Sequence, residues 1–427
     1  LSQPLEQLAR LCAMRPGNLH EPFELLRGLG SPTLREQRLR EQPPRSRRLP
    51  VRLDRAFEVR SGLAGLARFE QEVAGAAGAR YGVGVSSGTA GLHLCMIAAG
   101  VGEGDVVLTT PFSFIASANC ILYVRAQPVF VDVDPRTLTI DPQALARTMR
   151  ELGRLGRPVK AILPVHVFGQ PADMDPILDL ARQHRVAVVE DACEAIGATY
   201  KGRPVGALGH AGVFAFYPNK QLTTGEGGMI VTDHASCDAL VRSLRNQGRD
   251  VFDGWLSHTR LGYNYRLDEL SAALGLAQIA RLDEILRKRE RVAGWYRARL
   301  ERLDGVTPPV VASWTTRTSW FVYVVRLAPG GVRDRVIVDL DRRGIPARPY
   351  FPPIHLQPFY RAQFGFHRGQ FPVAEAAGER CLALPFFSSM REEQVDTVCD
   401  ALREALRLQQ RHARASAQRA LPAGASL

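Results

Sequence analysis

One lysine lies in a segment that could turn its amine into a nucleophile. Residues 212–216 form an apolar run, and the turn that follows contains Pro218 and Lys220 before a glycine-rich stretch at 223–228. A lysine amine gains nucleophilicity when the end of a buried strand removes it from water. The alternative is an ordinary surface lysine on a loop, which is the usual location of this residue type.

Three acids, Glu190, Asp191 and Glu194, lie at the end of a second apolar run, Val186–Glu190. In open α/β sheets, ligands bind at the carboxyl ends of the strands. An acid at that edge needs a cationic partner or a raised pKa. The protonated pyridine nitrogen of pyridoxal 5'-phosphate (PLP) is one such partner, because PLP works as an electron sink in that state. The alternative is that these acids cap a helix.

The segment Ser86–Thr89 lies between a predicted strand and a predicted helix. Free backbone N–H groups at such a helix start form an anion site, to which Ser and Thr hydroxyls add donors. A phosphate is therefore one interpretation, and a plain N-cap at Ser87 or Thr89 is an equally good one. No GxGxxG motif follows any predicted strand, which argues against a dinucleotide-binding fold.

These three segments belong to a regular alternation of apolar runs and stretches with helical spacing. Predicted strands span 81–85, 105–109, 128–133, 159–165, 186–190, 212–216 and 228–232. Predicted helices span 66–79, 89–99, 115–123, 141–152 and 174–184. Apolar strands separated by helices predict an α/β fold with a mostly parallel sheet that helices cover on both faces. The three segments then meet at one edge of that sheet.

The rest of the chain predicts a smaller α+β C-terminal domain. A long helical stretch at 267–303, broken once, leads into a strand at 320–327 and helices at 334–343 and 392–406. We expect a basic N-terminal segment without regular structure, a large PLP-binding domain, a small domain and a flexible tail. Their predicted bounds are 1–60, 61–295, 296–410 and 411–427.

Charge and cysteine content exclude several functions. The net charge of +12 comes mostly from the two ends, with +5 in residues 1–60 and +4 in residues 403–427, so the body offers no basic groove for nucleic acid. No apolar window is long enough for a membrane span, and the charged N-terminus lacks the apolar core of a secretory signal. Seven cysteines without a CxxC pair favour a reduced, cytoplasmic protein and provide no zinc site.

In this order, the motifs of the chain resemble those of the DegT-type sugar aminotransferases, a branch of the fold type I PLP enzymes. The resemblance extends from about Arg68 to Leu406. The motifs include SSGTAGLHL at 86–94, PFSFIASAN at 111–119, EDACEAIGATYKGRPVG at 190–206, FAFYPNKQLTTGEGGMIVTD at 214–233, LGYNYRLDELSAALGLAQ at 261–278 and RPYFPPIHLQPFY at 348–360. Several long motifs in one order are far more specific than any single motif.

The resemblance assigns roles around the cofactor. Lys220 matches the lysine that holds PLP covalently and moves the proton during transfer, and Asp191 matches the acid that pairs with the pyridine nitrogen. Glu194 stands near the cofactor's 3-hydroxyl, where many relatives have Gln or His. Gly88 and Thr89 match the turn that binds the phosphate.

The resemblance also reaches the ring face, the partner subunit and the substrate. Phe114 matches the aromatic residue that stacks on the cofactor ring, with a plain core position as the alternative. Asn264 matches a residue that reaches the phosphate of the neighbouring subunit, which implies a homodimer with shared active sites. His355 and Arg266 lie in segments that line the sugar site, although Arg266 could be only structural.

The implied reaction is a transamination in two halves. An amino acid, usually L-glutamate, gives its amino group to PLP, and a nucleotide-linked keto sugar then accepts it for aminosugar or polysaccharide biosynthesis. Two other interpretations stay open: a PLP- or sugar-binding relative without turnover, and an enzyme that acts on a cyclitol or another keto substrate. Two features motivate the first interpretation. Ala215 stands where many relatives have a serine that contacts the phosphate, and the stretch 61–65 before Phe69 is short.

Overall fold

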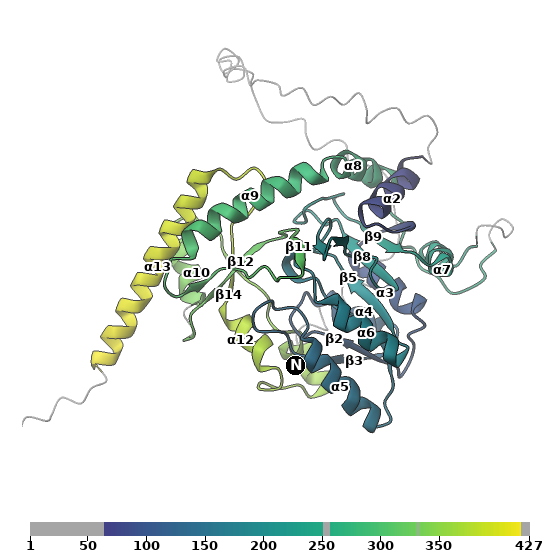
Figure 1. Cartoon of the computed structure of the whole chain (residues 1–427), viewed down its shortest axis with the longest axis horizontal. Helices are drawn as coiled ribbons and strands as arrows, with labels where there is room; N and C mark the ends of the chain where they lie inside the picture. The colour runs from purple at the N-terminus through teal and green to yellow at the C-terminus, as the bar shows by residue number, and fades with distance from the viewer. Residues whose placement is uncertain (1–63, 251–256, 331–332, 420–427) are drawn as a thin grey trace, which may run out of the picture. The chain divides into compact units, whose positions relative to one another are not determined.

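The computed structural model describes residues 64–250, 257–330 and 333–419 (Figure 1). Its central sheet has seven strands in the order β1-β9-β8-β5-β4-β2-β3. The strands are β1 Tyr81–Val85, β2 Val106–Thr109, β3 Gln127–Phe130, β4 Val159–Ile162, β5 Ala187–Asp191, β8 Ala211–Ala215 and β9 Gly228–Thr232. Pairing is parallel from β3 through β8, and β9 is antiparallel to both β8 and β1. The predicted mostly parallel sheet is confirmed.

Helices cover both faces of this sheet because successive strand side chains point to opposite sides. On β2, Val107 packs with α3, α4 and α7, whereas Val106 and Leu108 pack in the cluster that contains α2, α5, α6 and α8. These helices are α2 Ala64–Ala76, α3 Gly88–Ala98, α4 Ala116–Tyr123, α5 Pro142–Arg154, α6 Met174–His184, α7 Ala235–Arg245 and α8 Glu269–Ile279. The continuous apolar strands of the sequence are therefore buried on two sides.

The long helical stretch divides once, as predicted, into α8 and α9 Leu282–Leu300. The Asp268 carboxylate caps α8 by accepting a hydrogen bond of 2.9 Å from the Ser271 N–H. In Figure 1, α9 runs from beside α8 to α13, and its residues divide between two cores. Leu286 packs in the core of the central sheet and Tyr296 in the second core. The predicted division after residue 295 thus falls inside a helix that both cores share.

The second core lies under a four-stranded antiparallel sheet in the order β10-β12-β14-β13. Its elements are β10 Val306–Thr307, β12 Tyr323–Leu327, β13 Arg348–Pro349, β14 Cys381–Leu384, α10 Arg333–Asp341 and α13 Glu392–Arg419. The remaining short elements are β6 Thr199–Tyr200, β7 Arg203–Pro204, β11 Thr315–Arg317, α11 Pro358–Phe364 and α12 Pro372–Arg380, with 3-10 turns at Val167–Gly169 and Ile354–Leu356. The sequence pattern predicts none of the two- and three-residue strands.

The structure describes part of the predicted C-terminal tail and none of the predicted N-terminal segment. The expected flexible tail from residue 411 is helical as far as Arg419, because its Ala, Gln and Arg residues are strong helix formers. Residues 420–427 and the predicted N-terminal segment 1–60 lie outside the described residues, so the prediction for that segment is untested.

A glycine pair tests how tightly α2 and α8 pack. A Cβ atom on Gly275 in α8 would lie 2.5 Å from the ring of Phe69, whereas one on Gly294 in α9 would meet no atom within 4 Å. We expect Gly275→Ala to lower the free energy of unfolding by about 1–3 kcal/mol through overpacking. Gly294→Ala should raise it by up to about 1 kcal/mol through helix propensity. Urea denaturation of both variants measures this, and effects of the same sign would contradict the packing argument.

Candidate active site

A cavity of about 600 Å³ opens at the carboxyl ends of the parallel strands. Ligands bind at that edge in open α/β sheets, because the loops that follow the strands converge there. Six of the predicted site residues line the cavity, namely Gly88, Thr89, Phe114, Asp191, Glu194 and Lys220. The structure therefore brings together groups that are separated by more than a hundred positions in the chain.

Lys220 is held by the turn that follows β8. Its backbone N–H donates to the Tyr217 carbonyl at 2.9 Å, which closes the turn predicted around Pro218. The side chain is only 13% exposed, and its Nζ lies 3.6 Å from Glu194 Oε1 and 4.1 Å from the centre of the Phe321 ring. The alternative of a solvated surface lysine is therefore wrong.

Glu194 is the acid nearest to Lys220. Its side chain is buried, and Oε2 accepts a hydrogen bond of 2.8 Å from the Phe168 N–H. Burial raises the pKa of Glu194, and the nearby Lys220 charge opposes that effect only in part. This carboxyl group is therefore easier to protonate than an exposed glutamate.

The neighbouring acids of β5 point to opposite sides of the sheet. Asp191 lines the cavity, accepts 2.6 Å from the Ser117 hydroxyl through Oδ2, and accepts 3.2 Å from the Cys193 N–H through Oδ1. Glu190 is fully buried away from the cavity, where three backbone N–H groups at 206–209 donate to it and His166 Nε2 lies at 2.9 Å. Asp191 thus faces the ligand space, whereas Glu190 holds a loop together.

The start of α3 is compatible with both interpretations of its sequence, an N-cap and an anion site. The Ser87 hydroxyl accepts 3.1 Å from the Ala90 N–H, so Ser87 is the N-cap. The N–H groups of Gly88 and Thr89, in the first turn, have no acceptor within the helix, which leaves them for an anion. A Cβ atom on Gly88 would lie 2.8 Å from Ala215 and from the Cys193 sulfur, so only glycine fits there.

Phe114 lines the cavity with 60% of its surface exposed, so the alternative of a core position is wrong. Tyr217 also lines the cavity and is half exposed, close to Ala215, where many relatives were expected to have a serine. These two aromatic side chains give the cavity an apolar wall beside its charged groups.

Asn264 and Arg266 lie outside the cavity lining. Both are exposed, and the Arg266 guanidinium donates 3.0 Å to the Asn246 side-chain oxygen. Their predicted contacts with the partner's phosphate and with the sugar stay predictions, because no second subunit or ligand is present to test them.

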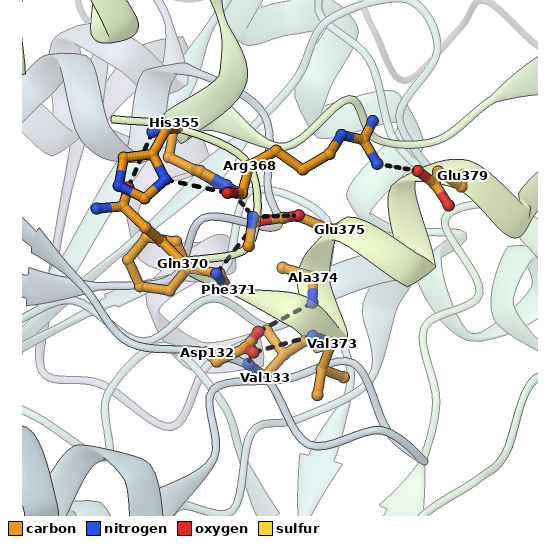
Figure 2. Close-up of polar contacts among 12 residues, drawn as sticks. Asp132, Val133, His355, Arg368, Gln370, Phe371, Val373, Ala374, Glu375 and Glu379 are labelled. Carbon is orange, nitrogen blue, oxygen red and sulfur yellow. Dashed lines mark hydrogen bonds and ion pairs between the residues drawn. The ribbon is translucent and has the colours of Figure 1, made fainter. Parts of the chain in front are cut away.

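His355 is placed differently from its prediction. It is fully buried, does not line the cavity, and its Nε2 lies 3.0 Å from Glu375 Oε1 (Figure 2). Burial lowers the pKa of His355, and the nearby Glu375 opposes that effect only in part. Its neighbours Ile354 and Gln357 do line the cavity. The geometry therefore gives His355 the role of anchoring a cavity wall, and its contact with a sugar stays untested.

The anchor continues through α12. Glu375 also accepts hydrogen bonds from the N–H groups of Gly369 and Phe371, at 2.8 Å and 3.2 Å (Figure 2). At the start of the same helix, the Asp132 carboxylate accepts from the Val373 and Ala374 N–H groups at 3.0 Å and 2.9 Å. Asp132 follows β3, so this cap joins the central sheet to the wall of the cavity.

The sequence analysis does not identify three residues at the site. Ser117 bonds Asp191, Phe321 packs on Lys220, and Gln221 Nε2 donates 2.6 Å to both the Glu194 carbonyl and the Ser319 hydroxyl. Ser117 lies within the PFSFIASAN motif, which was the only available signal. Phe321 lies just before β12, about a hundred positions after Lys220, and no local pattern marks it.

The cavity fits PLP by the chemistry of its groups. Asp191 can pair with the protonated pyridine nitrogen, the start of α3 can hold the phosphate, and Lys220 can bond the aldehyde carbon. An acid, an anion-binding helix start and a lysine at the edge of a mostly parallel sheet define the site of a fold type I PLP enzyme.

Comparisons with known proteins identify the family of the chain. The sequence profile of the DegT/DnrJ/EryC1/StrS aminotransferase family matches residues 60–403. The chain is 43% identical over 344 residues to a GDP-perosamine synthase from Caulobacter vibrioides, covering 80% of this chain and 90% of the relative. It is 40% identical over 343 residues to a UDP-N-acetyl-3-dehydro-α-D-glucosamine 3-aminotransferase from Acidithiobacillus ferrooxidans, covering 79% and 87%.

A solved structure is similar as well. DesV from S. venezuelae, crystallised with a ketimine intermediate, superposes with a TM-score of 0.76 at 35% identity over 82% of this chain and 92% of DesV. The chain belongs to the DegT/DnrJ/EryC1/StrS aminotransferase family, and it is a PLP-dependent enzyme. Within its described residues, no helix combines the length and apolar character that a membrane crossing requires.

The raised pKa of Glu194 predicts a pH-dependent stability. Its folded-state pKa lies above the unfolded value of about 4.3, so the stability it contributes is present below that value and is lost as the pH rises through the folded pKa. Glu194→Gln should therefore raise the Tm of the PLP-free protein at pH 8 by roughly 1–3 °C, with a gain that shrinks toward pH 4. Thermal unfolding between pH 4 and pH 8 measures the difference.

The control for this experiment is Glu226→Gln, which changes an exposed acid at the same cavity. We expect no pH-dependent gain from it. A Glu194→Gln gain that grew toward acidic pH would contradict the burial of an ionised carboxylate.

Proposed function

We propose that this enzyme moves an amino group from an amino acid, L-glutamate above all, to a keto sugar linked to a nucleotide. The observation that carries the proposal is the presence of Lys220 and Asp191 in one cavity that also has an anion-binding helix start. The names of two relatives support it, because one makes GDP-perosamine and the other aminates a UDP-linked 3-dehydro sugar. The product would serve aminosugar or polysaccharide biosynthesis.

Each residue has a part in this reaction. When bound, PLP withdraws electrons from the carbon that carries the amino group. Lys220 moves a proton to and from that carbon as a general acid and base, with Glu194 3.6 Å from its amine. Asp191 holds the ring nitrogen, and Ser117 orients Asp191. Gly88 and Thr89 hold the phosphate at the start of α3. The presence of Lys220, Asp191 and the start of α3 in one cavity argues against a relative that binds PLP without catalysing a reaction.

We infer that the enzyme acts as a homodimer in the cytoplasm. Leu270 and Leu274 lie one turn apart on α8 and are 86% and 44% exposed, which is unusual for leucine pairs on a monomer. The exposed Asn264 precedes the same helix, in keeping with a role in the active site of the partner. The six cysteines among the described residues are free thiols, which suits a reducing compartment.

Lysine replacement tests the reaction. We expect Lys220→Ala to abolish the visible absorption band of lysine-bound PLP and to lower kcat for transamination by at least about 10³-fold, because the proton carrier is lost. Borohydride reduction followed by peptide mapping should label Lys220 alone among the four lysines of the chain.

Lys201→Ala is the matched control, because Lys201 is exposed and paired with Asp175. It should keep the absorption band and the rate. A panel of GDP- and UDP-linked keto sugars then identifies the acceptor. Wild-type protein that binds PLP but accepts no amino group from L-glutamate would contradict the proposed donor.

The exposed leucines predict the assembly. Leu270→Glu combined with Leu274→Glu should convert a dimer of twice the 47.0 kDa chain mass into monomers and remove activity, because each site would lose the partner's Asn264. Light scattering coupled to gel filtration measures the mass. Leu155→Glu, at a leucine that is 64% exposed beyond the end of α5, is the control and should leave the mass unchanged. A wild-type monomer with full activity would contradict the shared site.

A further inference from the structure

A second recess adjoins the active-site cavity. Its volume is about 580 Å³, and it shares Asn219, Lys220, Phe321 and Tyr350 with the first cavity. Its far wall comes from α9 and from the loop that follows β14, including Arg289 and Ser388. The lysine therefore borders two spaces, and only the first is accounted for by the cofactor.

Arg289 is a buried cation at this recess. It is 6% exposed, and its guanidinium donates to the carbonyls of Trp320 and Phe321 at 2.6 Å and 2.8 Å and to the Ser388 hydroxyl at 3.3 Å. An arginine has five N–H donors, so two are left. No carboxylate of the described residues lies within ion-pair distance of it.

The charge of Arg289 persists at neutral pH. Burial lowers the pKa of Arg289 to about 10, which is still well above 7. A buried charge that has no countercharge is costly, and a bound anion would remove that cost. Of the other three cations of the recess, Lys220 lies 3.6 Å from Glu194, and Arg281 and Lys288 share the Glu284 carboxylate at 3.0 Å and 2.5 Å. Arg289 is thus the cation of this recess that lacks an acidic partner among the described side chains.

Phe321 contacts both Arg289 and the reacting amine. Its carbonyl accepts from Arg289, and its ring lies 4.1 Å from Lys220 Nζ. A cation and a reactive amine thus lie on two sides of one residue, in one recess. This arrangement matches a small ligand that carries an amino group at one end and a carboxylate at the other.

We propose that the recess binds the amino-acid donor, with a donor carboxylate on Arg289 and the donor amino group toward Lys220. The inference rests on the proposed transamination and adds the residue that selects the donor. Two free N–H groups on a planar guanidinium suit the two oxygens of a carboxylate. The Ser388 hydroxyl, next to the guanidinium, is a further polar contact for the same group.

Binding of glutarate to the full-length PLP-loaded protein tests this directly, because glutarate has both carboxylates of glutamate and no amino group. Calorimetry should show binding that Arg289→Gln weakens at least about tenfold, as expected for loss of hydrogen bonds to a charged group. Arg289→Lys should weaken glutarate binding by an intermediate amount, because lysine keeps the positive charge but lacks the paired N–H groups of the guanidinium. Arg287→Gln is the matched control, at an exposed arginine on the opposite face of the same helix, and it should bind glutarate as the wild type does.

A second variant keeps the test valid if Arg289→Gln does not fold. Ser388→Asp leaves the bonds from Arg289 to the two carbonyls in place and adds an acid that competes for the guanidinium. It should abolish glutarate binding and raise KM for L-glutamate at least about tenfold.

The outcomes separate the two proposals. Unchanged glutarate binding in folded Arg289→Gln and Ser388→Asp would overturn the donor recess, even if transamination were normal. Arg289-dependent binding of a nucleoside diphosphate in place of glutarate would also overturn it. If wild-type protein binds glutarate through Arg289 but does not transfer the amino group of L-glutamate, the recess stands and the proposed donor fails.

Discussion

The parallel pairing of β5 with β8 is the constraint on which the active site depends. Asp191 pairs with Val213 in this register, so the acid and the turn that carries Lys220 leave the sheet at one edge. On the other side of β8, antiparallel β9 brings Gly228 against the backbone of Ser87 and Gly88. The lysine, the acid and the anion-binding helix start are therefore placed by strand order, and none depends on a long flexible loop.

The charges around this edge differ in how the fold satisfies them. Glu190 is buried but accepts three backbone N–H groups, so it is a structural acid. Asp191 accepts a hydrogen bond from the Ser117 hydroxyl and faces the space where a cationic ring nitrogen fits. Glu194 and Lys220 form a loose pair at 3.6 Å, and Arg289 has only neutral partners. Charges without a close counterion in a cavity are candidates for binding a charged cofactor or substrate.

The walls of the site come from parts of the chain that sequence distance separates. Asp132, after β3, caps α12, and His355 joins the cavity segment to Glu375 in that helix. Phe321 contacts Lys220 from the segment before β12, and Arg289 of α9 lines the recess that Lys220 also borders. The cavity therefore combines residues at the strand ends of the central sheet with Phe321 and the segment 349–357 from later in the chain.

Much of the fold and the centre of the site followed from local patterns. Apolar runs and helical spacing predicted the parallel sheet, and the strand ends marked three segments, those of Lys220, Asp191 and Gly88, as candidates for chemistry. The resemblance to a family supplied the cofactor. Ser117, Phe321, Arg289 and the inward burial of His355 were decided only by the tertiary structure. Each of them acts through a contact between residues distant in sequence, and periodicity carries no information about such contacts.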